Sequence, residues 1–172
     1  VVRIEGYTDS TGGEQENLNL SRARAHTETN LQNARELFER VSGGLLAAKS
    51  AGWDERALSQ VCEKITDGTH QTPTSYEEGV IFLSSRNVTS RKIDWENVKY
   101  IDEAQHLAMH KRVAPRKGDV LLAKNGTTGV AAIVDRDEVF DIYVSLAHLR
   151  PLETIEPEFL LYYLNSGVAK AQ

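Results

Sequence analysis

The spacing of apolar residues divides the chain into a helical first part and a strand-rich second part. Beginning at residue 31, apolar side chains recur at steps of three and four, at Leu31, Ala34, Phe38, Val41 and Leu45. Such spacing places them on one stripe of a helix that packs against another helix. We therefore predict a long helix that ends near Ser50 and has a partner helix. Gly43 and Gly44 weaken this prediction, since each glycine costs roughly 1 kcal/mol relative to alanine in a helix.

After Gly52 the pattern changes to short apolar runs that are separated by Gly, Pro, Asn, Asp and Ser. The runs LSQVCEKI, VIFLSS, NVKYI, DVLLAK, GVAAIVD and VFDIYVSLAHL are typical of strands. Two helices interrupt them. One is capped by Asp102 and extends from Glu103 to about His110, and the other has Pro157 in its first turn and ends at Gly167. The predicted fold class is α+β.

The first 25 residues differ from both parts. They open with an alternating stretch through Val2, Ile4 and Gly6, continue into the turn-rich run GYTDSTGGE, and become helical in pattern after Asn17. We predict a strand, a loop and the start of a helix.

Length and composition fit one globular domain with an appendage. The chain has 172 residues, of which 40% are hydrophobic and 26% charged. Neither an apolar run of the roughly 20 residues that cross a bilayer nor a signal peptide is recognisable, so we expect a cytoplasmic protein.

The single cysteine, Cys62, excludes an internal disulfide and a four-cysteine zinc site, and we expect it to be buried and inert.

The formal charge of −5 disfavours nucleic-acid binding, but the charge is unevenly distributed. Between residues 86 and 124 nine cations stand against five acids, which makes this stretch locally +4. The cations are Arg86, Arg91, Lys92, Lys99, Lys111, Arg112, Arg116, Lys117 and Lys124. This stretch is compatible with a basic face for DNA and also with ordinary solvated surface charge.

Two motifs are candidates for ligand sites, one for phosphate and one for a metal ion. The run NGTTG, residues 125–129, lacks the lysine–serine ending of a phosphate-binding loop. His106 and His110 have the spacing of two metal ligands on a helix, but HLAMH has no glutamate base and no third ligand nearby in sequence. We interpret these histidines as surface or capping residues.

Three features of the sequence bear on catalytic activity. Asp119 and Lys124 suggest a nuclease, but Leu122 stands where a second carboxylate would hold magnesium. Cys62 lies in an apolar run, where a thiol nucleophile is not expected. A methyltransferase string with adjacent prolines is absent. We therefore expect a chain without catalytic activity of its own.

Polar loops at the ends of the predicted strands offer groups that read bases or hold phosphates. They are residues 66–75, 84–92 and 123–129. Arg and Lys suit guanine, and Asn and Gln suit adenine. The candidate DNA-binding residues are Thr69, His70, Gln71, Ser85, Arg86, Asn87, Arg91, Lys92, Lys124, Asn125 and Thr127.

Several long strings, in order, resemble a type I restriction-modification specificity subunit. They include TETNLQNARELFERV, VCEKITDGTHQTP, FLSSRNVTSRKIDWE, KGDVLLAKNGTTGVAAIV, YVSLAHLRP and PEFLLYYLNS. The resemblance implies a spacer helix of the coiled-coil type over residues 26–52. It also implies a target-recognition domain over residues 53–172, with a mixed, mainly antiparallel sheet and peripheral helices, and we expect this domain to be incomplete at its C-terminus.

The same resemblance implies a division of labour. A specificity subunit binds double-stranded DNA at a split site and directs partner subunits to it. Modification subunits with S-adenosylmethionine methylate an adenine, and a translocase and endonuclease subunit uses ATP and magnesium; this chain itself needs no cofactor. Because the family's polypeptide carries two such domains and this chain holds one, reading both half-sites implies a homodimer through the spacer helix.

The string VRIEGYTDSTGGEQENLNLSRARA, in residues 1–25, is similar to the peptidoglycan-binding domain of outer-membrane-protein-A-like proteins. In that family an Asp and an Arg at the positions of Asp9 and Arg24 hold the ammonium and carboxylate of diaminopimelate. The alternative function is therefore that of a cell-envelope module that binds peptidoglycan through Asp9 and Arg24.

Overall fold

The computed structural model describes residues 13–48, 52–89, 91–126 and 128–171. The chain divides into two compact units at Leu45 and Leu46. The first contains one long helix, α1 (Glu14–Ala47), which begins with acidic residues that favour the positive end of the helix dipole. The helix is continuous through residues 25 and 26, where the two resemblances meet, and through both glycines. The predicted strand near Val2 lies outside the described residues.

Helix α1 has no buried residue. The apolar stripe predicted from the sequence is present, with Leu31, Val41 and Leu45 exposed at 51%, 53% and 61%. Hydrogen bonds between side chains one turn apart, such as that from Gln32 to Glu36, support the helix locally. The partner helix that this stripe indicates stays a prediction.

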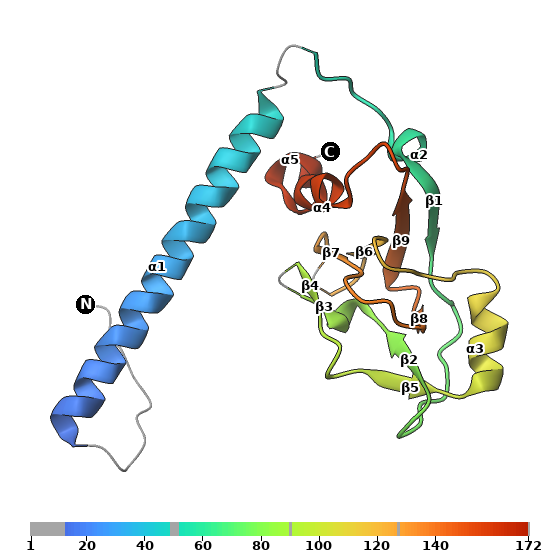
Figure 1. Cartoon of the computed structure of the whole chain (residues 1–172), viewed down its shortest axis with the longest axis horizontal. Coiled ribbons are helices and arrows are strands. Elements are labelled where there is room, and N and C mark those ends of the chain that lie inside the picture. The colour runs from blue at the N-terminus through green and yellow to red at the C-terminus, as the bar shows by residue number, and fades with distance from the viewer. Residues whose placement is uncertain (1–12, 49–51, 90, 127, 172) are drawn as a thin grey trace. The chain divides into compact units, whose positions relative to one another are not determined.

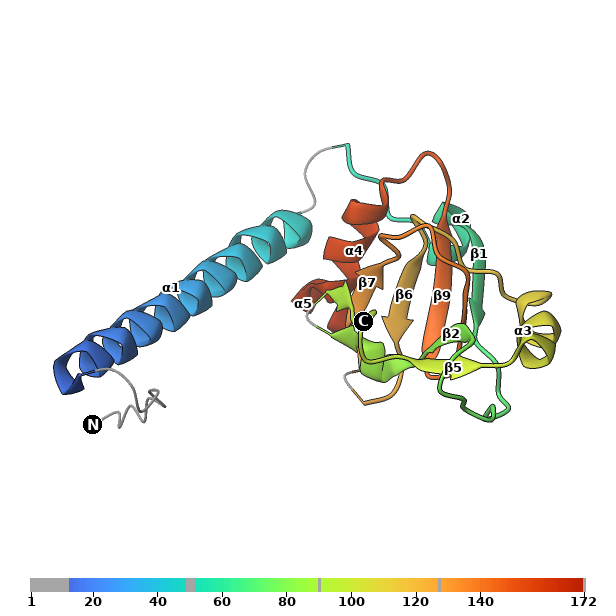
Figure 2. The same ribbon diagram turned by 60° about the horizontal axis from the view of Figure 1, so that its bottom comes forward.

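The second unit is an α+β domain (Figures 1 and 2). Its helices are α2 (Leu58–Val61), η1 (Ser85–Asn87), α3 (Glu103–His110), α4 (Pro157–Asn165) and α5 (Gly167–Lys170). Its strands are β1 (Cys62–Asp67), β2 (Val80–Leu83), β3 (Val88–Thr89), β4 (Lys92–Ile93), β5 (Lys99–Ile101), β6 (Val120–Ala123), β7 (Ala131–Ile133), β8 (Phe140–Ile142) and β9 (Leu146–Pro151).

The strands form a four-stranded sheet in the order β1-β9-β6-β7, a three-stranded sheet in the order β5-β2-β8, and the β3-β4 hairpin. Among the strand pairs of the described residues, only β2 and β8 run parallel. The predicted mixed, mainly antiparallel fold is therefore confirmed.

Both faces of the four-stranded sheet are covered. Leu121 and Ala132 point into a core shared with the three-stranded sheet, whereas Val120 and Ala131 point into a second core shared with α4. Helix α4 packs against β7 and β6, and Figure 2 shows it beside β7. Two covered faces explain why β6 reads as the unbroken apolar run VLLA and not as an alternation of apolar and polar residues.

The predicted helices are largely confirmed, and two boundaries need correction. Asp102 caps α3, because its carboxylate accepts a hydrogen bond of 2.8 Å from the backbone N–H of Gln105. The run LSQV was predicted as strand but forms the short helix α2, and the strand begins at Cys62. Helix α4 ends at Asn165, and Gly167 begins α5 instead of closing α4.

Within the described part of the chain, none of the helices combines the length and the apolar character of a membrane span.

Candidate nucleic-acid interface

Strand direction brings three chain segments to one edge of the four-stranded sheet. Strands β1 and β6 both pair antiparallel with β9, so they run in the same direction and their carboxyl ends share an edge. Asp67, at the end of β1, lies opposite Ala147, and Ala123, at the end of β6, lies opposite Leu146. The loops that follow these two strands are therefore neighbours.

Ser145 joins this edge to the loop after β2. Its hydroxyl accepts a hydrogen bond of 3.0 Å from the backbone N–H of Ser85, and its carbonyl accepts one of 2.8 Å from the N–H of Lys124. Thr69 is held in the same way, because its N–H donates to Ile142 and its carbonyl accepts from Val144, both at 2.9 Å. We call residues 69–71, 85–87, 124–126 and 143–145 the loop edge.

Asp67 holds the basic groups of the loop edge. Its carboxylate lies 3.0 Å from Lys124 Nζ, 3.2 Å from His70 Nε2 and 3.5 Å from the Arg112 guanidinium. The hydrogen bond from Lys124 lowers the pKa of Asp67, and the neighbouring His70 acts in the same direction. The carboxylate thus holds together Lys124 and Arg112, two cations that would otherwise repel one another, and also contacts the His70 ring.

Candidate residues of the loop edge differ in their exposure. His70, Gln71, Arg86 and Asn125 are exposed, and Lys124 is exposed while paired with Asp67. Their side chains come from three different loops, so the structure brings together groups that the sequence placed up to 55 positions apart. These side chains are accessible to a ligand.

Asn87 and Ser85 are buried, which differs from their expected role as base-contacting residues. The side-chain oxygen Oδ1 of Asn87 accepts a hydrogen bond of 3.0 Å from the backbone N–H of Ser84, and its Nδ2 donates to the backbone carbonyls of Asp94 and Asn97. Both residues build the short turn η1 that presents Arg86. The Asn87 side chain and the Ser85 backbone N–H bond within the fold, so these two residues support the loop edge from inside the domain.

The remaining candidates lie elsewhere. Arg91 and Lys92 belong to the β3-β4 hairpin, where Arg91 adopts a left-handed conformation with φ 66°. Arg24 lies on the exposed surface of α1. Thr127 and Asp9 lie outside the described residues.

Residues that sequence reasoning missed complete this region. A cavity of about 240 Å³ lies between loop 69–73 and α3 and is lined by Asp141 and Arg112 among others. The Arg112 guanidinium donates to the carbonyls of Asp67 and Gly68. Tyr143 bonds Thr72 through the two hydroxyl groups at 3.1 Å. A polar loop is recognisable in the sequence from its residue types, but the distant residues that bond to it are not.

Asp119, weighed above as a nuclease residue, belongs to a buried network. Its carboxylate lies 2.6 Å from His148 Nε2 and accepts hydrogen bonds of 2.9 Å from Arg150 Nε and Nη2. Burial raises the pKa of Asp119, but the hydrogen bonds from His148, Arg150 and the Arg116 backbone outweigh burial and lower that pKa to about 2. This carboxylate ties β6 to β9.

Cys62 is buried, as predicted, and burial raises the pKa of its thiol.

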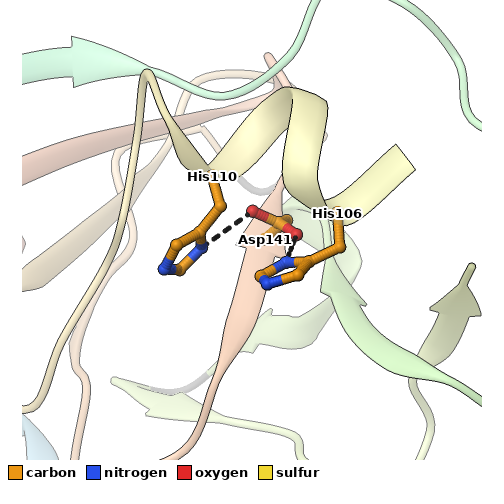
Figure 3. Close-up of side chains that lie close together, drawn as sticks. All are labelled: His106, His110 and Asp141. Atoms are coloured by element: carbon orange, nitrogen blue, oxygen red, sulfur yellow. Dashed lines mark hydrogen bonds and ion pairs between the residues drawn. The ribbon is translucent and has the colours of Figure 1, made fainter. Parts of the chain in front are cut away.

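The interpretation of His106 and His110 as surface or capping residues is wrong. Both rings bond the buried carboxylate of Asp141, with Nδ1 to oxygen distances of 2.7 Å and 3.2 Å (Figure 3). The carboxylate comes from β8, a segment distant in sequence from α3.

Neither a family model nor a curated protein matches this chain. Solved structures, in contrast, match most of this chain. The crystal structure of the HsdS subunit from Thermoanaerobacter tengcongensis superposes with a TM-score of 0.56 over 88% of this chain, at 19% sequence identity. The chain has the HsdS fold. A chain from a structure concerning complex assembly and conformational transition of the type I R-M system matches over 92% of this chain, with a TM-score of 0.53 and 20% identity.

This HsdS-like chain spans 38% and 42% of the lengths of those two chains. At these identities the likeness establishes the fold. It agrees with the order of elements that the sequence predicted, a long helix followed by a strand-rich domain.

Proposed function

We propose that this chain is a DNA-binding specificity module of a type I restriction-modification system and that its loop edge contacts the DNA. The observation that carries the proposal is the convergence of three polar loops, which bear His70, Arg86 and Lys124, on one edge of a domain with the HsdS fold. Polar side chains from several loops can contact base edges and phosphates together, whereas a single loop offers too few groups.

The exposed side chains of the loop edge fall into two roles. Arg86 is presented by the buried turn residues and suits bidentate bonding to guanine, while Gln71 and Asn125 carry the amide groups that suit adenine. Lys124 and His70 are held by Asp67 and suit phosphate contacts that position the duplex. The net charge of −5 makes the affinity of the isolated chain weak and strongly dependent on salt.

In this proposal the chain performs no chemistry. Modification subunits supply S-adenosylmethionine-dependent methylation, and a translocase and endonuclease subunit supplies ATP- and magnesium-dependent cleavage. The exposed apolar stripe of α1 supports pairing of two chains through this helix, which would place two reading domains at a fixed separation and let helix length set the half-site spacing.

Methylome sequencing of cells that carry the partner subunits tests the proposal. The variant combines Arg86→Ala with Asn125→Ala. The matched control is Lys117→Ala, because Lys117 is an exposed cation before the amino end of β6, whereas the loop edge lies at the carboxyl ends of β1 and β6. We expect the methylated motif to change or disappear in the double variant and to persist in the control. An unchanged motif in the double variant would exclude these side chains from base recognition.

A further inference from the structure

His106, His110 and Asp141 form a compact cluster that the proposed DNA contacts do not use. The two histidines lie one turn apart on α3, and Figure 3 shows both imidazole rings directed toward the carboxylate, which comes from β8. Nδ1 of His106 lies 2.7 Å from one carboxylate oxygen, and Nδ1 of His110 lies 3.2 Å from the other. The ring centroids are 4.6 Å apart.

The surroundings of this carboxylate are unusual. The Asp141 side chain is 1% exposed, and within the described part of the chain its recorded side-chain partners are the two imidazoles, with no lysine or arginine paired to it. A buried carboxylate requires either a compensating charge or full hydrogen bonding, because its desolvation is costly. The two imidazoles are therefore the hydrogen-bonding partners of this buried carboxylate among the described residues.

We propose that this cluster binds a divalent transition-metal ion of the zinc type through His106 Nδ1, His110 Nδ1 and the Asp141 carboxylate. One candidate ligand atom from each residue lies within 4.8 Å of the others. Zinc bonds of about 2.0–2.2 Å arranged tetrahedrally separate neighbouring donors by about 3.3–3.5 Å, so small side-chain rotations admit the ion. Two imidazoles and one carboxylate form a donor set that suits zinc and its neighbours better than magnesium or calcium.

The cavity of about 240 Å³ adjoins the carboxylate side of this cluster. Asp141 lines it together with Gln105 and Met109 of α3, the two histidines are not among its lining residues, and it is large enough for water. The ion would compensate the charge of Asp141 and join α3 to β8 by coordination bonds.

Such a site would act on the loop edge through α3, a consequence that rests on the proposed function. The Gln105 side chain accepts from the N–H of Thr74 at 2.9 Å and donates to its carbonyl at 3.2 Å. Arg112, just after α3, donates to the carbonyls of Asp67 and Gly68. An ion that fixes α3 therefore also orders the segment that carries His70 and Gln71.

Isothermal titration of chelator-stripped full chain with ZnCl₂, without DNA and without a polyhistidine tag, tests the proposal. We expect one equivalent of Zn²⁺ to bind and Co²⁺ to give the visible absorption of a low-symmetry site. His110→Gln should weaken binding at least tenfold, since it removes one ligand from a partly exposed position. His26→Gln, which replaces an exposed histidine on α1, is the control and should bind like the parent.

A second measurement separates a metal site from a purely hydrogen-bonded cluster. Metal binding through Nδ1 leaves the proton on Nε2, whereas hydrogen bonding to the carboxylate keeps it on Nδ1. Long-range ¹H–¹⁵N spectra of the histidine rings should therefore show His106 and His110 change tautomer when Zn²⁺ is added. Absence of zinc binding, equal binding by parent and His110→Gln, or unchanged tautomers would each overturn the proposal. Because no DNA is present, none of these outcomes depends on the proposed function.

Discussion

Helix α1 and the domain that follows it obtain their structure from different sources. None of the described residues of α1 is buried, whereas the second unit buries Leu121, Leu146 and Phe140 completely. The helix relies on backbone propensity and contacts between neighbouring turns, which leave isolated helices marginal in water. The domain relies on packing between segments that are distant in sequence. The helix therefore leaves its apolar residues exposed, whereas the domain holds its surface loops in place by packing.

The largest expected effect comes from breaking the buried ion pairs of the domain. Asp119→Ala leaves Arg150 and His148 without their partner and should lower the free energy of unfolding by about 3–5 kcal/mol. Urea denaturation followed by tryptophan fluorescence measures this loss. Asp137→Ala, at an exposed carboxylate, is the control and should change the midpoint little. Equal midpoints for the two variants would show that the network contributes no stability.

A pair of leucine variants compares the two units directly. Leu121→Ala empties a fully buried position and should cost about 2–5 kcal/mol. Leu37→Ala changes a side chain that is 52% exposed and should cost less than about 0.5 kcal/mol in the dilute monomer. Chemical denaturation of both variants at several protein concentrations measures the difference. A cost for Leu37→Ala that grows with concentration would reveal pairing of α1.

Acid should weaken the domain more than the helix. The pKa of Asp119 lies at about 2 in the folded chain, below its ordinary value of 3.8. Its contribution to stability is therefore complete above about pH 4 and is lost as the pH falls through about 2, with a magnitude of about 2 kcal/mol. Urea midpoints measured between these values should fall in the parent. Midpoints in Asp119→Asn should fall less steeply, and parallel curves would contradict this assignment.

A modest gain in stability is expected at the glycines of α1. Space for a β-carbon is open at Gly44, with no neighbouring atom within 4 Å. Gly44→Ala should therefore stabilise the helix by roughly 1 kcal/mol, and circular dichroism at 222 nm should report an increase in helix content. Gly68→Ala is the contrasting variant, because its β-carbon would collide with the backbone carbonyl of Ile142. A gain of stability there would contradict the described packing.

Local signals in the sequence predicted the helices well and the strand ends less well. Asp102 marked the start of α3, and Pro157 marked the first turn of α4. The run LSQV was misassigned because an apolar run of this length suits a strand and one helical turn equally. The misplaced end of α4 has a similar cause, since Ser166 both ends α4 and caps α5.

The candidate site was predictable as a set of polar loops but not as an arrangement. Asn87 has the residue type of a base-contacting side chain, yet its amide is used by Ser84, Asp94 and Asn97. Residue type reports which hydrogen bonds a side chain can make, whereas burial decides which of them remain available. The same distinction separates Arg86, which is exposed, from Ser85 beside it.

The sequence alone determined the order of elements, the α+β class and the positions of the polar loops, because periodicity, caps and turn residues act over a few neighbouring positions. Only the tertiary structure decided which distant groups meet. Lys124 pairs with Asp67 across 57 positions, and His106 reaches Asp141 across 35. These contacts depend on strand pairing and register, which are properties of the whole sheet.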